Sequence, residues 1–210
     1  MAKLKGPLFS FDASGALADA LVYFPWKGLS VVRKYVIPAN PKTTAQNTQR
    51  GYVTEAVNKV HAVQILASHA LDAADIAAYA SLALTEPSPR TWFNEVVKKW
   101  VDCRVATKIP VIYSDGTISD PSASSFDCIL YINEKTASQL AAGKFYFGTS
   151  KTALINSSAA TVEAGTSVAL ADKDLSAFLS AGTKYFMQFR PDAEDPCEGA
   201  VSGIFTFTAT

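Results

Sequence analysis

Histidine is the usual general base and a common metal ligand, and the 210-residue sequence contains only His61 and His69. The two positions are eight residues apart, so a single helix running through both would place them two turns apart on roughly the same side. That separation is too large for one metal ion. We therefore expect each histidine to have a surface or a structural role.

Two acidic groups could bind calcium or act as acid–base pairs: Asp172 with Asp174, and Asp192 with Glu194 and Asp195. Both groups lie in expected loops, where solvated carboxylates are common, so solvation is the favoured interpretation. The sequence also lacks the nucleophile-elbow, Walker, dinucleotide-binding and zincin motifs. It therefore predicts a non-enzymatic protein with no catalytic residue, cofactor or metal ion.

The three cysteines, Cys103, Cys128 and Cys197, are odd in number, widely spaced and without a C-x-x-C pair. This pattern indicates neither a disulfide framework nor a zinc site. The favoured interpretation is that they are small buried apolar residues.

The composition is that of a globular protein, with 49% hydrophobic and 18% charged residues. Lys plus Arg and Asp plus Glu each number 19, so no long-range positive field would attract nucleic acid. Near-zero net charge also suits a protein that is held in an assembly. No signal-peptide core follows Lys3 and Lys5, and no apolar run reaches the ~20 residues of a membrane span. We expect no membrane partner, and synthesis in the cytosol.

The first expected elements are two strands. Apolar runs over residues 17–24 and 29–37 flank Pro25-Trp26-Lys27-Gly28, which is a hairpin signal. Arg33 and Lys34 fall within the second run, so one face is either wet or paired with another surface. The aromatic loop over residues 24–28 is either an exposed contact point or packs on the helices that follow, and both interpretations remain open.

Three helices are expected next. Thr43 and Gln46 form a capping box, and an amphipathic helix should follow. Asp72 is the expected N-cap of a second helix reaching about Leu84, with Asp75 in its first turn. A third should start at Ser88-Pro89. The sequence predicts a small antiparallel cluster packed against the hairpin. The expected apolar stripes are Val53, Ala56, Val57, Val60, Val63 and Ala67 in the first helix, and Phe93, Val96, Val97 and Trp100 in the third.

After Pro110 the apolar period changes from helical to about two, and turn residues become frequent. Short strands with such spacing favour an antiparallel sandwich. The sequence thus predicts an α+β protein: a hairpin and three-helix module over residues 1–108, and an Ig-like antiparallel β-sandwich over residues 109–210. The expected strands are residues 111–113, 126–133, 144–147, 166–170, 184–190 and 203–208.

The segment containing Leu179, Gly182, Thr183 and Tyr185 resembles the stretch before the second-last strand of fibronectin type III and related domains. That resemblance implies a tyrosine corner, in which the Tyr185 hydroxyl bonds back to the preceding loop. The tryptophan that these families bury on the third strand is absent. Its space would be filled by Phe145, Tyr146 or Phe147.

A combination of N-terminal motifs resembles the opening of a family of proteins coded among the virion genes of tailed bacteriophages. In that family a small-residue hairpin with a W-K-G turn leads into an N-P-x-T/S-x-x-Q helix start, and a fibronectin-like domain often follows. The motifs that carry the resemblance are Gly15-Ala16-Leu17, Trp26-Lys27-Gly28, Val31-Val32-Arg33, Pro38-Ala39-Asn40-Pro41 and Thr44-Ala45-Gln46 through Arg50.

The resemblance implies a non-enzymatic virion component of the head, neck or tail, whose partners are other virion proteins and copies of itself. A hairpin with an open edge can extend a neighbour's sheet through main-chain hydrogen bonds. The alternatives are a surface or host-recognition module that binds through the Ig-like domain, and an enzyme. The expected assembly residues are Phe24, Trp26, Lys27, Val31, Val32 and Arg33.

Overall fold

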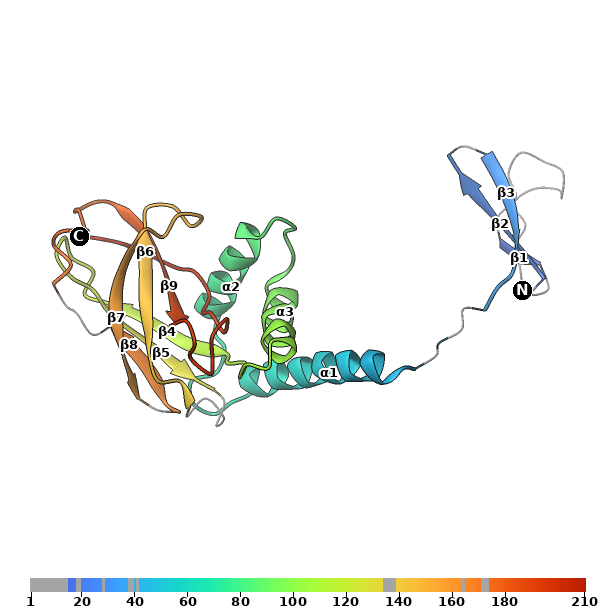
Figure 1. Ribbon diagram of the computed structural model, residues 1–210. Helices are drawn as coiled ribbons and strands as arrows, with labels where there is room; N and C mark the ends of the chain where they lie inside the picture. Colours follow the sequence, from blue (N-terminus) through green and yellow to red (C-terminus); the bar gives the residue numbers. More distant parts are fainter. Residues whose placement is uncertain are drawn as a thin grey trace. The chain divides into compact units, whose positions relative to one another are not determined.

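The protein was analysed as a computed structural model, which describes residues 15–17, 20–27, 29–37, 40, 42–133, 139–163, 165–170 and 174–210. The chain forms two compact units, Met1–Thr43 and Thr44–Thr210. Within the described residues the architecture is α+β, with three helices, a small antiparallel sheet and a large one (Figure 1). The small sheet belongs to the first unit, and the helices and the large sheet belong to the second.

The small sheet has the antiparallel order β1-β2-β3. In its hairpin Trp26 is in register with Leu29, so two residues connect the strands. Lys27, the first of them, has a φ of 49°, the left-handed conformation that two-residue hairpin turns require. The hairpin therefore forms where the sequence predicts it. The strands are β1 (Gly15–Leu17), β2 (Leu21–Trp26) and β3 (Leu29–Lys34).

The helices are α1 (Thr44–Gln64), α2 (Ala73–Thr85) and α3 (Trp92–Val105), and both α1 and α2 pack on α3. α1 begins one residue after Thr43, its expected N-cap. At the start of α2, Asp72 Oδ1 accepts a hydrogen bond from the Asp75 backbone N–H (2.8 Å), as expected of an N-cap. The start of α3 differs from the prediction at Ser88-Pro89. Thr91 is the N-cap there, because its hydroxyl accepts from the Asn94 N–H at 3.4 Å.

The large sheet has the order β10-β9-β6-β7-β8-β5-β4, and every pairing is antiparallel. Residues 156–159 of β7 pair with β6, whereas residues 160–163 pair with β8. β7 thus connects a β4-β5-β8 half to a β6-β9-β10 half. The strands are β4 (Tyr113–Ser119), β5 (Asp127–Ile132), β6 (Gly143–Gly148), β7 (Asn156–Glu163), β8 (Ser167–Leu170), β9 (Lys184–Pro191) and β10 (Phe205–Thr208).

Aromatic side chains fill the core between the two halves. Phe145 and Phe147 are fully buried, and the Phe145 ring lies 5.3 Å from the ring of Phe189. They are two of the three residues expected to fill the space of the absent tryptophan, and both lie in the interior. Tyr146, the third candidate for that space, points to the opposite face of β6, under the guanidinium of Arg190.

The helices share a second core with the large sheet. Val60, Leu82 and Trp100 pack in one cluster with the sheet-side residues Ile112 and Ile204. The helices bury their apolar stripes partly against the sheet, so they belong to the same unit as the sheet. The boundary between the units thus lies between residues 43 and 44, whereas the sequence predicted it between residues 108 and 109.

β10 and the residues just before it pack against α2. The Ile204 N–H donates to the Ala78 carbonyl at 2.9 Å. A Cβ on Gly203 would lie 2.7 Å from the Ala78 carbonyl carbon, a distance that real side chains do not reach. Glycine is therefore required for this contact between helix and sheet.

Candidate functional site

The small sheet has no buried side chain among those that the structure describes. Burial is described for residues 15–16, 20–27, 31–37, 40 and 42–43, and none of them is buried. Trp26 is 60% exposed and Val32 is 50% exposed. A three-stranded sheet normally needs one covered apolar face to be stable in water. These strands thus present apolar surface that remains available to a partner.

The six expected assembly residues fall on both faces and on the turn of this sheet. The antiparallel register pairs Phe24 with Val31, so these two side chains share a face with Trp26 and Arg33. The Arg33 guanidinium lies 5.4 Å from the centre of the Phe24 ring, within cation–π range. Val32 lies on the opposite face. Lys27 is exposed in the turn.

Among the strands that the structure describes, none pairs with the outer edge of β3. Tyr35 N–H donates to the Ala20 carbonyl (2.8 Å), which marks that pair as hydrogen-bonded and fixes the alternation along the ladder. By this alternation the pair of Tyr23 and Val32 is not hydrogen-bonded within the hairpin. The N–H and C=O groups of Val32 therefore point away from β2. Pro25 falls at another such position, where a missing N–H costs the β2–β3 ladder nothing.

The residues expected to form a tyrosine corner lie at the start of β9. The Tyr185 hydroxyl donates to the Phe178 carbonyl (3.2 Å) and accepts from the Ser180 N–H (3.0 Å). Leu179 is buried beneath this loop, and Gly182 has a φ of +73°, which favours glycine. Thr183 N–H donates to the Ser180 carbonyl. These contacts fix the loop to the sheet, which is a structural role.

The expected acidic groups do not converge on one site. Asp195 is buried, and its carboxylate accepts from the backbone N–H groups of Ala141, Ala142 and Cys197. It therefore holds two loops together. Asp174 accepts from the N–H and hydroxyl of Ser176 in a local turn. Among the described residues no group of three His, Cys, Asp or Glu side chains could hold a metal ion.

Asp192 and Glu194 make hydrogen bonds through their backbone N–H groups. Asp192 N–H donates to the Ala142 carbonyl, and Glu194 N–H donates to the Glu198 carboxylate. Five residues of the sequence motifs lie outside the described residues. They are Gly28, Pro38, Ala39, Pro41 and Asp172.

The two histidines lie in different surroundings. His61 Nδ1 lies 3.1 Å from Gln64 Oε1 on the exposed side of α1. His69 Nδ1 lies 2.6 Å from Asp115 Oδ2, and its ring stacks on Tyr131 with a centroid distance of 3.4 Å. Ser114 is adjacent, but its hydroxyl donates to the His69 backbone carbonyl and not to the ring. This arrangement ties a loop to the sheet and does not form a nucleophile–base pair.

Asp75 has a larger role than the sequence indicates. It is fully buried, and its carboxylate accepts from the N–H groups of Asp72 (3.1 Å), Asp115 (2.7 Å) and Gly116 (3.0 Å). The last two lie at the register shift in β4, where the ladder leaves backbone donors unpaired. Burial raises the pKa of Asp75, against the opposing effect of these hydrogen bonds. Asp75 thus joins α2 to the irregular start of the sheet.

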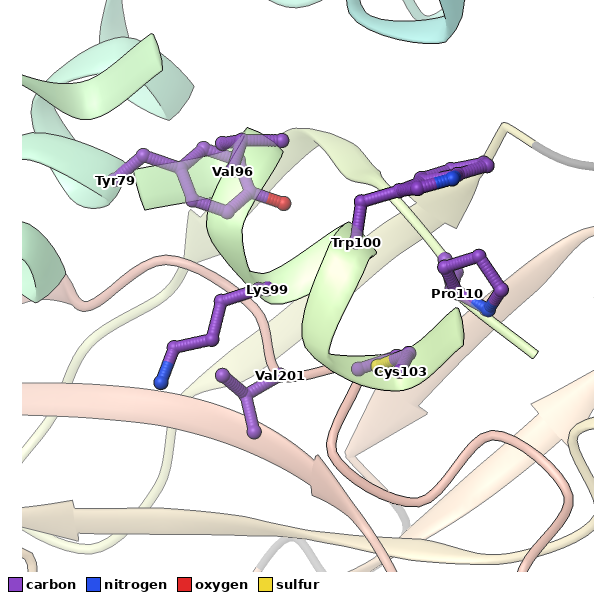
Figure 2. Close-up of a pocket in the computed structure, with 9 residues that line it drawn as sticks. Tyr79, Val96, Lys99, Trp100, Cys103, Pro110 and Val201 are labelled. Atoms are coloured by element: carbon purple, nitrogen blue, oxygen red, sulfur yellow. The ribbon is translucent and has the colours of Figure 1, made fainter. Parts of the chain in front are cut away.

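The space between α3 and residues 200–201 is well packed. Figure 2 shows Tyr79 and Val96 on one side of it, and Trp100 above Pro110 on the other. Its cavity volume is about 10 Å³, roughly the space for one water molecule. This void is part of the core and is too small for a ligand.

The three cysteines are buried free thiols. Burial raises the pKa of Cys103 to about 11 and that of Cys197 to about 12, and it raises the pKa of Cys128 further. A thiol with so high a pKa is protonated at neutral pH and is a poor nucleophile. No helix in the described part of the chain is long and apolar enough to cross a membrane.

Comparisons with known proteins supply no relative: no family model, no curated protein and no solved structure matches the chain.

Proposed function

We propose that the chain is a non-enzymatic structural protein of a tailed-bacteriophage virion that assembles with its neighbours through the small sheet of residues 15–37. The observation that carries the proposal is that no residue of this unit whose burial is described is buried, and that Trp26 and Val32 are exposed. A sheet without a core gains stability by covering its apolar side chains on another surface. The resemblance of the N-terminal motifs to phage virion proteins supports this function and suggests the particle.

The edge of β3 supplies a mechanism. Its open N–H and C=O groups, centred on Val32, are suited to pairing with a strand of a neighbouring subunit. Main-chain hydrogen bonds would fix the register of the two subunits, and burial of Trp26 would add hydrophobic stabilisation. The partners that this mechanism takes are other virion proteins or further copies of the chain.

We also infer that the large sheet is an Ig-like sandwich. Numbered from β4 as the first strand, its halves have the orders first-second-fifth-fourth and third-sixth-seventh. This is the arrangement of the seven-stranded immunoglobulin constant-type fold. The bonds of the Tyr185 hydroxyl to the preceding loop support the same inference. In this proposal the sandwich is a rigid body that the assembled particle displays or docks.

Location on a particle can be tested by imaging. An antibody raised against the chain should label purified virions of the phage that carries this gene, and negative-stain images would show whether the label sits on head, neck or tail. Virions that stay unlabelled, while the antibody binds the free chain, would refute the virion assignment.

The assembly mechanism can be tested at Val32. Val32→Pro removes an N–H that the hairpin does not use, and proline is tolerated on an edge strand. We expect this variant to lose incorporation into particles, because edge pairing needs that donor. Val32→Thr, which keeps the N–H, is the matched control and should incorporate normally. Normal incorporation of Val32→Pro would show that edge pairing is wrong.

The alternative is a host-recognition module that binds through the sandwich loops. Clustered exposed aromatic side chains at one end of the sandwich would favour it. Among the described residues of the second unit, Phe178 is the one phenylalanine or tryptophan with a largely exposed side chain. Its ring still contacts the ring of Phe147. The exposed apolar surface of the small sheet therefore favours assembly over loop-mediated recognition.

A further inference from the structure

A cleft with a volume of about 370 Å³ lies within the second unit, between the helices and the outer face of the large sheet. The C-terminal part of α2, the middle of α3, the connection from β6 to β7 and the end of β9 each contribute to it. Its volume is within the range of small-molecule sites. The lining residues are Leu82, Thr85, Glu86, Lys99, Lys151, Thr152, Gln188, Arg190, Val201 and Ile204.

Positive charge dominates the cleft. Three cations line it, Lys99, Lys151 and Arg190, against the single carboxylate of Glu86. The Lys99 amine lies 2.8 Å from Glu86 Oε1, and this hydrogen bond lowers the pKa of Glu86, so the two charges offset each other. In Figure 2 the Lys99 side chain extends away from Trp100. The other two cations remain without a compensating carboxylate in the lining.

Arg190 is held in place by neutral groups. Its Nε–H donates to Gln188 Oε1 at 2.8 Å, and its guanidinium lies 4.8 Å from the centre of the Tyr146 ring. Gln188 is itself only 2% exposed, and its Nε2 donates to the Ser202 carbonyl at 2.9 Å. A buried amide thus fixes the orientation of the guanidinium. Such preorganisation reduces the entropy cost of binding a ligand.

The donor groups of the two cations are available. Among the residues that the structure describes, the terminal nitrogens of Arg190 and the amine of Lys151 have no hydrogen-bond or ion-pair partner. Lys99, by contrast, is paired with the carboxylate of Glu86. The Nε–H of Arg190 instead donates to the neutral amide of Gln188, which leaves the two terminal nitrogens of the guanidinium group available. These nitrogens match the two oxygens of a carboxylate or phosphate group.

We propose that this cleft is a binding site for an oxyanion, a carboxylate or phosphate group, with Arg190 as the bidentate donor and Lys151 as the second positive charge. Thr85, Thr152 and the outer rim of the cleft would contact the rest of the ligand. This inference goes beyond the assembly function and does not depend on it, because the cleft contains no residue of the small sheet.

The test uses the full chain and two probes, inorganic phosphate and glutarate, titrated at low ionic strength and followed by NMR shifts of backbone amides and of the Arg190 Nε–H. Wild type should bind at least one probe saturably. Arg190→Gln should weaken binding about tenfold or more, because a charge-assisted pair is lost. Lys151→Gln should weaken it several-fold. The matched control is Lys184→Gln, an exposed lysine at the other end of β9 and outside the cleft, and it should stay within about twofold of wild type.

Tighter binding of phosphate would assign a phosphate-bearing ligand, and tighter binding of glutarate a carboxylate-bearing one; either supports the site. Arg190→Lys keeps the charge but loses the bidentate guanidinium group, so it should also weaken binding. This variant provides the test of Arg190 if Arg190→Gln does not fold. Absence of saturable binding to both probes would overturn the proposal. Equal weakening by Lys184→Gln and Arg190→Gln would also overturn it, because it would show diffuse charge attraction alone.

Discussion

Replacing Asp75 with alanine tests whether this carboxylate holds α2 to the sheet. The substitution leaves the N–H groups of Asp115 and Gly116 without their acceptor, at a point where the β4 ladder cannot supply another. A buried donor that loses its partner costs about 1–3 kcal/mol. The Asp72 N–H, at the exposed helix start, can bind water instead. We therefore expect a loss of about 2–6 kcal/mol in the free energy of unfolding.

The stability that Asp75 contributes should also depend on pH. Because burial raises the pKa of Asp75, the folded protein binds more protons than the unfolded chain between the unfolded-state pKa, about 3.9, and the raised folded-state value. Stability from this group is therefore fully present below the unfolded-state pKa and is lost as the pH rises through the folded-state pKa. Asp75→Asn removes the titration. The stability of wild type relative to Asp75→Asn should thus increase on acidification from neutral pH.

Urea unfolding followed by far-UV circular dichroism measures both effects on the full chain. Asp102→Ala is the matched control, since it removes an exposed carboxylate paired with Lys98 on α3 and should cost less than about 1 kcal/mol. A loss for Asp75→Ala no larger than that of the control would refute the role of the carboxylate. A relative stability that falls on acidification would show that the hydrogen bonds outweigh burial in setting the pKa of Asp75.

Two further predictions concern the second unit. Tyr185→Phe should lower the free energy of unfolding, measured by urea unfolding, by about 1–2 kcal/mol, because the ring packing remains and only two hydrogen bonds to the preceding loop are lost. An unchanged free energy of unfolding would contradict a contribution of these hydrogen bonds. In the native protein at neutral pH iodoacetamide should leave the thiols unmodified, whereas urea-unfolded chain should react fully, as intact mass would show; rapid native labelling would contradict the burial of Cys103, Cys128 and Cys197.

Local signals account for the elements that the sequence predicts well. The hairpin turn at Lys27 and the N-cap at Asp72 depend on a few neighbouring residues, so their chemistry is readable in the sequence. The start of α3 was misplaced by three residues because Ser88 and Thr91 are both suitable caps, and local rules do not choose between them.

Strand β7 shows where local signals end. Its sequence, Asn-Ser-Ser-Ala-Ala-Thr-Val-Glu, is too small and polar to be recognised as a strand. It forms because β6 pairs with its first half and β8 with its second. Asp75 is similar, since its partners at Asp115 and Gly116 lie 40 and 41 residues away. The role proposed for Arg190 likewise depends on Lys151 and on residues of α2 and α3, which are distant in the sequence and line the same cleft only in the fold.

The contrast between the two units makes the assembly proposal separable from folding. Residues 44–210 have two buried clusters of their own, whereas the described residues before Thr44 have none. Val32→Pro should therefore abolish incorporation while leaving the urea midpoint of the second unit unchanged, and Asp75→Ala should lower that midpoint. If Val32→Pro lowered it as well, the small sheet would be stabilising the body of the protein, and loss of assembly could no longer be attributed to the open edge of β3.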